Sequence, residues 1–106
     1  MRLWVDDIRV PPEGWVWAKT SQEAIDAYQS WLYSSSDRYF EAIAFDHDLG
    51  EDDDSRRVLN YIVERDIWPD HIYFLTSNPV GRQWLEGTAR SYAPETTTIH
   101  AGQATA

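Results

Sequence analysis

Two unbroken apolar runs, Ala42–Phe45 and Ile72–Leu75, lie in the middle of the chain. Runs without polar alternation are typical of strands that are buried on both faces, and such strands occur in parallel sheets. Two consecutive parallel strands need a crossover between them, which is usually a helix. The intervening segment repeats apolar residues at helical spacing, at Val58, Leu59, Ile62 and Val63. The two runs and the segment between them therefore predict a strand–helix–strand unit in a parallel sheet.

Three further segments are predicted to be strands: Leu3–Val5, Trp15–Ala18 and the less apolar Thr96–Ile99. The stretch 8–14, between the first two, contains two prolines and a glycine, which favour a loop over a helix. The alternation of strands and helices predicts an α/β fold with a mostly parallel five-stranded sheet of flavodoxin-like order. In this fold a loop replaces the first crossover helix.

Capping residues mark the expected ends of the helices. Thr20–Glu23 matches a capping box ahead of an amphipathic segment. Asp54 or Ser55 is expected to cap the second helix, and Asn78–Pro79 to open the third. The first helix is expected to end at Ser34–Asp37. The first helix should bury Ala24, Ile25, Tyr28, Trp31 and Leu32. The third helix should bury Val80, Trp84, Leu85 and Thr88.

The chain has 106 residues and a formal net charge of −9. The length bears on the number of domains, and the charge bears on which ligands the protein can bind. The length suits one domain, placed at residues 1–100, followed by a small polar tail over 101–106 that is expected to fray. The 18 acidic and 9 basic residues disfavour binding to a long nucleic acid or an anionic membrane. Without cysteine, disulfides and thiolate sites are excluded. No targeting signal or membrane-spanning run is visible, so a cytoplasmic location is expected.

Acidic residues follow two of the predicted strands. Asp6 and Asp7 come after the first strand, and Asp46 and Asp48 come after the third. In a flavodoxin-like order these strands are neighbours, and ligands bind beyond the carboxyl ends of the strands. Carboxylates so close together repel unless a cation lies between them, and hard oxygen ligands suit Mg²⁺ or Mn²⁺. The pattern predicts a divalent metal site, with ordinary loop residues and helix caps as the alternative.

His47 lies between two of these aspartates and has two candidate roles. Acidic neighbours could tune it as a general acid or base. Strand alternation, however, points its side chain away from that of Asp46, which favours a structural role. The acidic run 51–54 is expected to be solvated, with its charge near the N-terminus of the next helix. His100, at the end of the last predicted strand, could reach the carboxylate edge.

These motifs resemble a receiver domain, the phosphoacceptor module of two-component signalling. The resemblance rests on Asp6–Asp7, on Asp46–Gly50 (DHDLG) and on Thr76. It implies that the first pair holds Mg²⁺, that the first residue of DHDLG occupies the phosphoacceptor position, and that the threonine contacts the phosphoryl group. A receiver also has a lysine at the end of strand five. Here that strand reads Thr96–His100, and Lys19 is the only lysine in the chain.

The chain more closely resembles the cyclic-phosphate-processing receiver-like domains of bacteria and phages. The matching motifs are LWVDDIRVPP at Leu3–Pro12, FDHDLG at Phe45–Gly50 and TSNPVG at Thr76–Gly81, and the resemblance spans residues 1–92. It implies a receiver-like three-layer sandwich, a divalent metal, and a role on cyclic or terminal phosphates of RNA or nucleotides. The chain departs from the family at Leu75, where a histidine is usual.

Our first hypothesis is a small metal-dependent phosphoesterase that acts on a cyclic phosphate of a nucleotide or an RNA end. A basic side chain would clamp the phosphate oxygens, hydrogen-bond donors would stabilise developing charge, and an imidazole would protonate the leaving oxygen. The expected metal ligands are Asp6, Asp7, Asp46 and Asp48, the expected catalytic residues are Asp46, His47, Thr76 and Asn78, and the expected phosphate contacts are Arg9, Lys19 and Ser77.

A second hypothesis is a catalytically degenerate binding protein of a kind that phages encode. It would sequester a nucleotide, or block a basic host protein through its acidic surface. Leu75 and the missing strand-five lysine favour this hypothesis. The missing lysine disfavours a third one, a true phosphoaccepting regulator.

Overall fold

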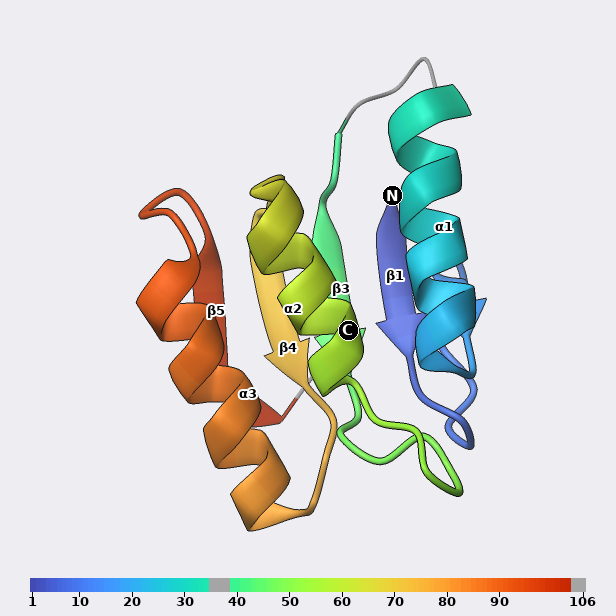
Figure 1. Ribbon diagram of the computed structural model, residues 1–106, viewed down its shortest axis with the longest axis vertical. Coiled ribbons are helices and arrows are strands. Elements are labelled where there is room, and N and C mark those ends of the chain that lie inside the picture. The colour runs from blue at the N-terminus through green and yellow to red at the C-terminus, as the bar shows by residue number, and fades with distance from the viewer. Residues whose placement is uncertain (35–38, 104–106) are drawn as a thin grey trace.

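The computed structural model describes residues 1–34 and 39–103, which form one five-stranded sheet with three helices (Figure 1). All strand pairs are parallel, in the order β2-β1-β3-β4-β5, which is the flavodoxin-like order. The predicted α/β fold is therefore confirmed. The elements are β1 (Arg2–Val5), β2 (Val16–Ala18), α1 (Ser21–Ser34), β3 (Ala42–Phe45), α2 (Arg56–Arg65), β4 (His71–Phe74), α3 (Pro79–Tyr92) and β5 (Thr98–Gln103).

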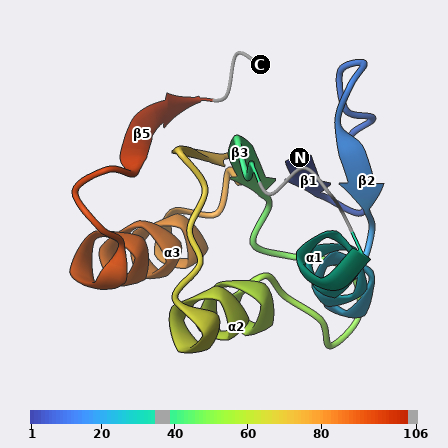
Figure 2. The ribbon, with the colours of Figure 1, turned by 90° about the horizontal axis from the view of Figure 1, so that it is seen from above.

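The described residues form two layers, not the predicted three. All three helices lie on the same face of the sheet (Figure 2). Right-handed crossovers explain this arrangement, because the connections from β2 to β3, β3 to β4 and β4 to β5 all advance in one direction across the sheet. The connection from β1 to β2 runs in the opposite direction, so a helix there would cover the other face. That connection is the predicted loop, and the third layer is therefore missing.

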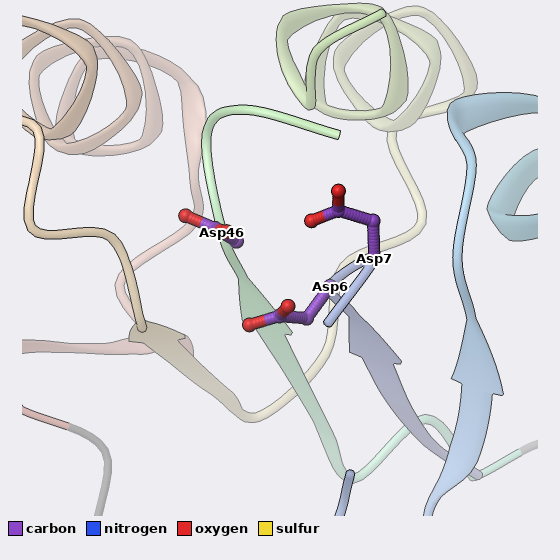
Figure 3. A group of neighbouring side chains, drawn as sticks. All are labelled: Asp6, Asp7 and Asp46. Atoms are coloured by element: carbon purple, nitrogen blue, oxygen red, sulfur yellow. The ribbon is translucent and has the colours of Figure 1, made fainter. Parts of the chain in front are cut away.

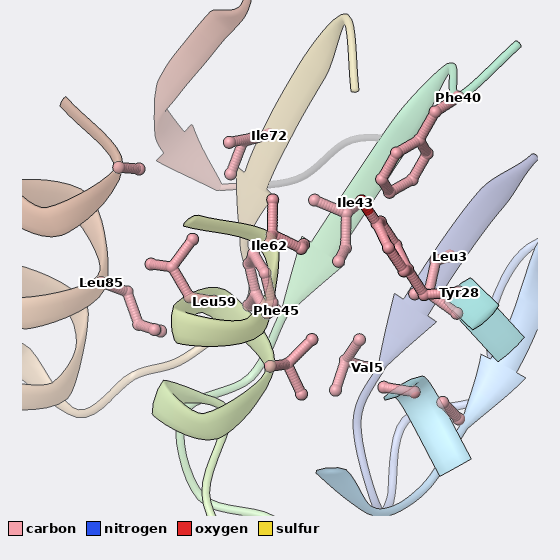
Figure 4. Close-up of a cluster of buried hydrophobic side chains, with 14 of the residues drawn as sticks. Leu3, Val5, Tyr28, Phe40, Ile43, Phe45, Leu59, Ile62, Ile72 and Leu85 are labelled. Carbon is pink, nitrogen blue, oxygen red and sulfur yellow. The ribbon is translucent and has the colours of Figure 1, made fainter. Parts of the chain in front are cut away.

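The hydrophobic core lies between the sheet and the helix layer (Figure 4). Alternate residues of the strands face the helices, and full burial of each such aliphatic or aromatic side chain stabilises the fold by about 1.5–3 kcal/mol. The fully buried strand residues in this core are Leu3, Val5, Ala18, Ile43, Phe45, Ile72 and Phe74. The helices contribute, among others, Tyr28, Leu59, Ile62 and Leu85.

The helices begin at the predicted capping residues. The N–H of Glu23 donates to Thr20 Oγ1, whereas the Glu23 carboxylate accepts from the N–H of Lys19. The Asn78 side chain accepts from two backbone N–H groups of α3, as expected for its N-cap. Of the predicted end of α1, Ser34 is the last helical residue, and 35–37 lie outside the described residues. In the described chain no helix is long and apolar enough to cross a bilayer.

The last strand, Thr98–Gln103, lies further along the chain than predicted. Thr97 turns into the structure, because its hydroxyl donates to the carbonyl of Pro69 over 2.7 Å. The ladder with β4 then starts at Thr98 and, after an irregularity, pairs Phe74 with Gln103. The Arg82 guanidinium also donates to the Ala101 carbonyl. Pairing with a neighbouring strand thus orders the backbone of residues 101–103, which their composition alone does not reveal.

The face of the sheet without helices is covered in part by the loop that replaces the crossover helix. The strand register places Trp17, Trp4, Ala44 and Tyr73 in one row on this face. Trp15 contacts two rings of the row edge-on, with ring centroids 5.4 Å from Trp4 and 6.4 Å from Tyr73. Ala44, between those rings, is fully buried. The Trp15 side chain therefore substitutes for part of the missing helix.

We expect Trp15→Ala to lower the free energy of unfolding by about 2 kcal/mol, less than the roughly 3–5 kcal/mol typical of a fully buried tryptophan. The reason is that the substitution exposes Ala44 and removes two aromatic contacts. Urea denaturation of the variant beside Tyr33→Ala measures the effect, since Tyr33 is 72% exposed. Equal stability of the two variants would show that Trp15 does not cover the sheet.

Candidate metal centre

The parallel pairing of β1 with β3 brings the first two acidic motifs together. Val5 lies opposite Phe45, and the ladder continues with the N–H of Asp46 donating to the Val5 carbonyl over 2.7 Å. The Asp6 N–H donates to the Ala18 carbonyl of β2 over 3.1 Å. Both aspartates therefore stand one residue beyond the end of a strand, at the same edge of the sheet (Figure 3).

Three carboxylates converge at this edge, from Asp6, Asp7 and Asp46 (Figure 3). One oxygen of each lies within 4.8 Å of the others. Opposite ligands of an octahedral Mg²⁺ are about 4.2 Å apart, because each oxygen is about 2.1 Å from the ion. Small side-chain rotations would bring the three oxygens into that range. The residues present therefore fit a hard divalent cation that retains several water ligands.

Asp6 is fully buried and holds the start of the following loop. Its Oδ1 accepts from the N–H groups of Ile8 and Arg9 over 2.8 and 2.9 Å. Its Oδ2 accepts from Arg9 Nη1 over 2.9 Å, and the same Nη1 lies 3.6 Å from Asp46 Oδ2. The hydrogen bond to Asp6 is the main reason that the pKa of Arg9 is raised. Arg9 thus supplies a positive charge to two of the three carboxylates.

The pKa of Asp46 is raised above its ordinary value, mainly by burial and next by the charge of Asp6. Arg9 and the hydroxyl of Thr76 act in the opposite direction but do not outweigh these causes. The side chain of Asp46 is 15% exposed. The ionised form of Asp46 is therefore destabilised in the metal-free protein, as expected for a carboxylate that lacks part of its counter-charge.

We expect Asp46→Asn to raise the Tm of the metal-free protein at pH 7 by about 4 °C, the shift that roughly 1 kcal/mol produces in a domain of this size. A raised carboxyl pKa means that the folded state binds the proton more tightly. Ionisation of Asp46 therefore costs stability as pH rises from the usual carboxyl range through the raised pKa. The gain should shrink on acidification through that window, as thermal melting with a chelator at several pH values will show.

Asp48→Asn is the matched control for this substitution. The pKa of Asp48 is lowered by hydrogen bonds from His47 and Asn78, so its ionised form contributes stability that is lost as pH falls through the lowered pKa. This variant should not gain stability at pH 7. A similar gain in stability in both variants would contradict the conclusion that the ionised carboxylate of Asp46 destabilises the fold.

Asp48 lies outside the group of three carboxylates and takes part in a separate network. Its Oδ1 is 3.1 Å from His47 Nδ1, and its Oδ2 accepts from Asn78 Nδ2 over 3.3 Å. His47 Nε2 accepts from Arg56 Nε over 3.0 Å, which leaves the ring proton on Nδ1, facing Asp48. This network joins the loop after β3 to the starts of α2 and α3. The contacts favour a structural role for His47, Asp48 and Asn78.

The remaining predicted residues lie at different distances from the carboxylates. Thr76 is buried, and the hydrogen bond from its hydroxyl is one of the interactions that lower the pKa of Asp46. Lys19 Nζ lies 4.4 Å above the Trp17 ring, whose Nε1 donates to the Asp6 carbonyl over 2.7 Å. Ser77 is exposed. His100 stacks on Tyr73 on the face without helices, so it does not extend to the carboxylate edge.

The acidic loop after β3 is more ordered than its composition suggests. Asp53 Oδ2 accepts from the N–H of Ser21, at the start of α1, and Asp54 Oδ1 accepts from the N–H of Arg56, at the start of α2. Gly50 has a φ of +84°, and a Cβ there would lie 3.4 Å from Asp7 Oδ2. The contact of Asp54 with the start of α2 is local in the sequence, whereas Asp53 accepts from the start of α1, 32 residues away, in addition to the local cap Thr20.

Comparison with known proteins gives one match. The model of a family described as cyclic-phosphate processing receiver domain matches residues 1–91. No curated protein and no solved structure matches the chain significantly.

Proposed function

Since the chain belongs to the family of cyclic-phosphate processing receiver domains, we propose that Asp6, Asp7 and Asp46 bind Mg²⁺ or Mn²⁺ and recruit a phosphate. The ligand class is a cyclic or terminal phosphate of a nucleotide or an RNA end. The observation that carries the proposal is the convergence of three carboxylate oxygens from two neighbouring strands within 4.8 Å. The raised pKa of Asp46 supports it, because a divalent cation would relieve the repulsion between the carboxylates.

A divalent cation bound there supplies a Lewis acid for the phosphoryl oxygen and lowers the pKa of a bound water. The residues of the chain then have separable roles. Arg9, whose side chain is 47% exposed, can bind a phosphate oxygen. Thr76, beside Asp46, can donate a hydrogen bond to the same group. His47 engages Asp48 and Arg56, so its contacts do not support the role of proton donor to a leaving oxygen.

The alternative function is binding without turnover, and two observations favour it. Both ring nitrogens of His47 are occupied by other residues. Leu75, at the position where the family usually has a histidine, cannot transfer a proton. A domain with a metal and a phosphate site but no proton donor would hold a nucleotide rather than hydrolyse it. Such a protein would act by sequestration.

The proposal is tested by thermal melting with Mg²⁺ or Mn²⁺ and by assays with 2′,3′-cyclic nucleotides. We expect millimolar Mg²⁺ to raise the Tm of the wild type by 5 °C or more, since a ligand at about 100 times its Kd stabilises by about 2.7 kcal/mol. Asp46→Asn should abolish the rise. Asp52→Asn makes the same charge change at an exposed loop residue and should retain it. Turnover lost in Asp46→Asn would support the enzyme.

Three outcomes of this experiment separate the candidate functions. A Mg²⁺-dependent rise in Tm together with turnover supports the phosphoesterase. A rise in Tm without turnover supports the binding protein. An unchanged Tm for the wild type at millimolar Mg²⁺ and Mn²⁺ would contradict the metal site and with it both functions.

A further inference from the structure

Arg9 lies between two of the three carboxylates of the candidate metal site. Its Nη1 is 2.9 Å from Asp6 Oδ2 and 3.6 Å from Asp46 Oδ2. These two aspartates come from the ends of β1 and β3, respectively. One guanidinium nitrogen therefore spans the same pair of strands as the candidate metal site.

The oxygen that Arg9 uses is also the Asp6 oxygen that a cation would use. Asp6 Oδ1 already accepts two backbone hydrogen bonds, from Ile8 and from Arg9 itself, over 2.8 and 2.9 Å. Two such donors take up the acceptor capacity of that oxygen. Oδ2 is the remaining acceptor, and it holds Arg9 Nη1. A divalent cation on Oδ2 would lie next to the Arg9 guanidinium, and the two positive charges would repel each other at that distance.

The backbone of Arg9 is held by buried partners, whereas its side chain is half-exposed. The Arg9 N–H donates to Asp6 Oδ1, and the Arg9 carbonyl accepts from Trp4 Nε1 over 2.9 Å. Trp4 is itself buried. The Arg9 side chain, by contrast, is 47% exposed. The guanidinium can leave the two carboxylates by rotation about its own side-chain bonds, with its Cα still beside the site.

From these contacts we infer that Arg9 is an internal counterion that a divalent metal displaces, and that the displaced guanidinium then binds the phosphate. The inference rests on the proposed function and adds the order of events at the site. Before the metal binds, Arg9 offsets part of the charge of Asp6 and Asp46. After the metal binds, it is a cation without a carboxylate partner, beside the proposed phosphate site. Metal and phosphate therefore bind cooperatively, because the metal repels the Arg9 guanidinium from the carboxylates and the phosphate attracts it.

The test is a Mg²⁺ titration of the ¹⁵N-labelled protein followed by NMR, with Arg9→Gln and Arg2→Gln as matched variants. Both variants remove one positive charge, but Arg2 pairs with Glu41, at the opposite end of β1. We expect Arg9→Gln to bind Mg²⁺ about tenfold more tightly than the wild type, and Arg2→Gln to bind within about twofold of it. Inorganic phosphate should tighten Mg²⁺ binding by the wild type severalfold, and by Arg9→Gln much less.

The same spectra report on the guanidinium directly and need no variant. In the wild type, the Nε–Hε signal of Arg9 should shift as Mg²⁺ is added and shift again with inorganic phosphate. The signal of Arg2 should stay in place. This measurement decides the question even if Arg9→Gln does not fold.

Two results would overturn the inference and can be told apart. If the wild type binds Mg²⁺ while Arg9→Gln binds it no more tightly and the Arg9 signal does not move, Arg9 is not displaced, and the metal site itself stands. If neither the wild type nor Arg9→Gln binds Mg²⁺, the inference and the proposed function fail together.

Discussion

Replacing Gly81 with alanine is expected to lower the free energy of unfolding by about 3 kcal/mol, at the upper end of the usual cost of overpacking. Gly81 is buried in the first turn of α3, against the His47 ring. A Cβ at this position would lie 2.4 Å from His47 Cγ and 2.7 Å from its Cδ2. The ring cannot move away easily, because Asp48 and Arg56 hold its two nitrogens. Urea denaturation followed by circular dichroism measures the loss.

Gly87→Ala, in the same helix, is the matched control. A Cβ at Gly87 meets no atom within 4 Å, so this substitution should gain up to about 1 kcal/mol from helix propensity alone. The difference between the two variants isolates the contact with His47. If Gly81→Ala proves as stable as Gly87→Ala, the close contact between Gly81 of α3 and the His47 ring is contradicted.

Replacing Asp6 with alanine is expected to cost about 3 kcal/mol in the metal-free protein, although it removes one of three mutually repelling carboxylates. The loss arises because the N–H groups of Ile8 and Arg9 lose their shared acceptor, and a hydrogen bond to a charged group contributes about 1.5–3 kcal/mol. The Arg9 guanidinium also loses its nearest partner. Partial exposure of Arg9 and relief of Asp46 offset part of this loss. Chemical denaturation in the presence of a chelator measures the effect.

Asp7→Ala provides the contrast, since the two aspartates are adjacent and both belong to the candidate metal site. Asp7 is half-buried, and no residue in the described part of the chain donates a hydrogen bond to its carboxylate. Its removal should leave the stability of the metal-free protein within about 0.5 kcal/mol of the wild type, while still weakening metal binding. Asp6→Asn, which keeps an acceptor oxygen, should fall between the two. Equal losses for Asp6→Ala and Asp7→Ala would show that the Asp6 hydrogen bonds are not stabilising.

The strands, the helices and the meeting of the two acidic motifs could be predicted because their signals are local in the sequence. Apolar runs and capping residues identify β3, α2 and α3 within a few residues. Once β1 and β3 are neighbours in a parallel sheet, any residue directly after either strand must lie at the same edge. Asp6 and Asp46 therefore had to be close, whatever the rest of the chain does.

Which polar groups face one another at that edge depended on contacts between distant segments. Asp48 follows the same strand as Asp46, yet it binds Asn78, 30 residues away, and His47 packs against Gly81 of α3. Both contacts depend on where α3 packs, and the spacing of apolar residues in the sequence does not predict that position. The missing third layer, by contrast, follows from the predicted loop, since the handedness of the crossovers places the three remaining helices on one face of the sheet.

The sequence by itself determined a parallel α/β domain with carboxylates at the ends of two neighbouring strands, because side-chain periodicity and strand ends are properties of the local chain. Only the tertiary structure decided that Arg9 lies between Asp6 and Asp46, that Asp46 is destabilised as an anion, and that His47 and Asp48 form a separate network. The physical reason is that charge energetics depend on burial and on the identity of the nearest partner. Both follow from how the elements pack against one another.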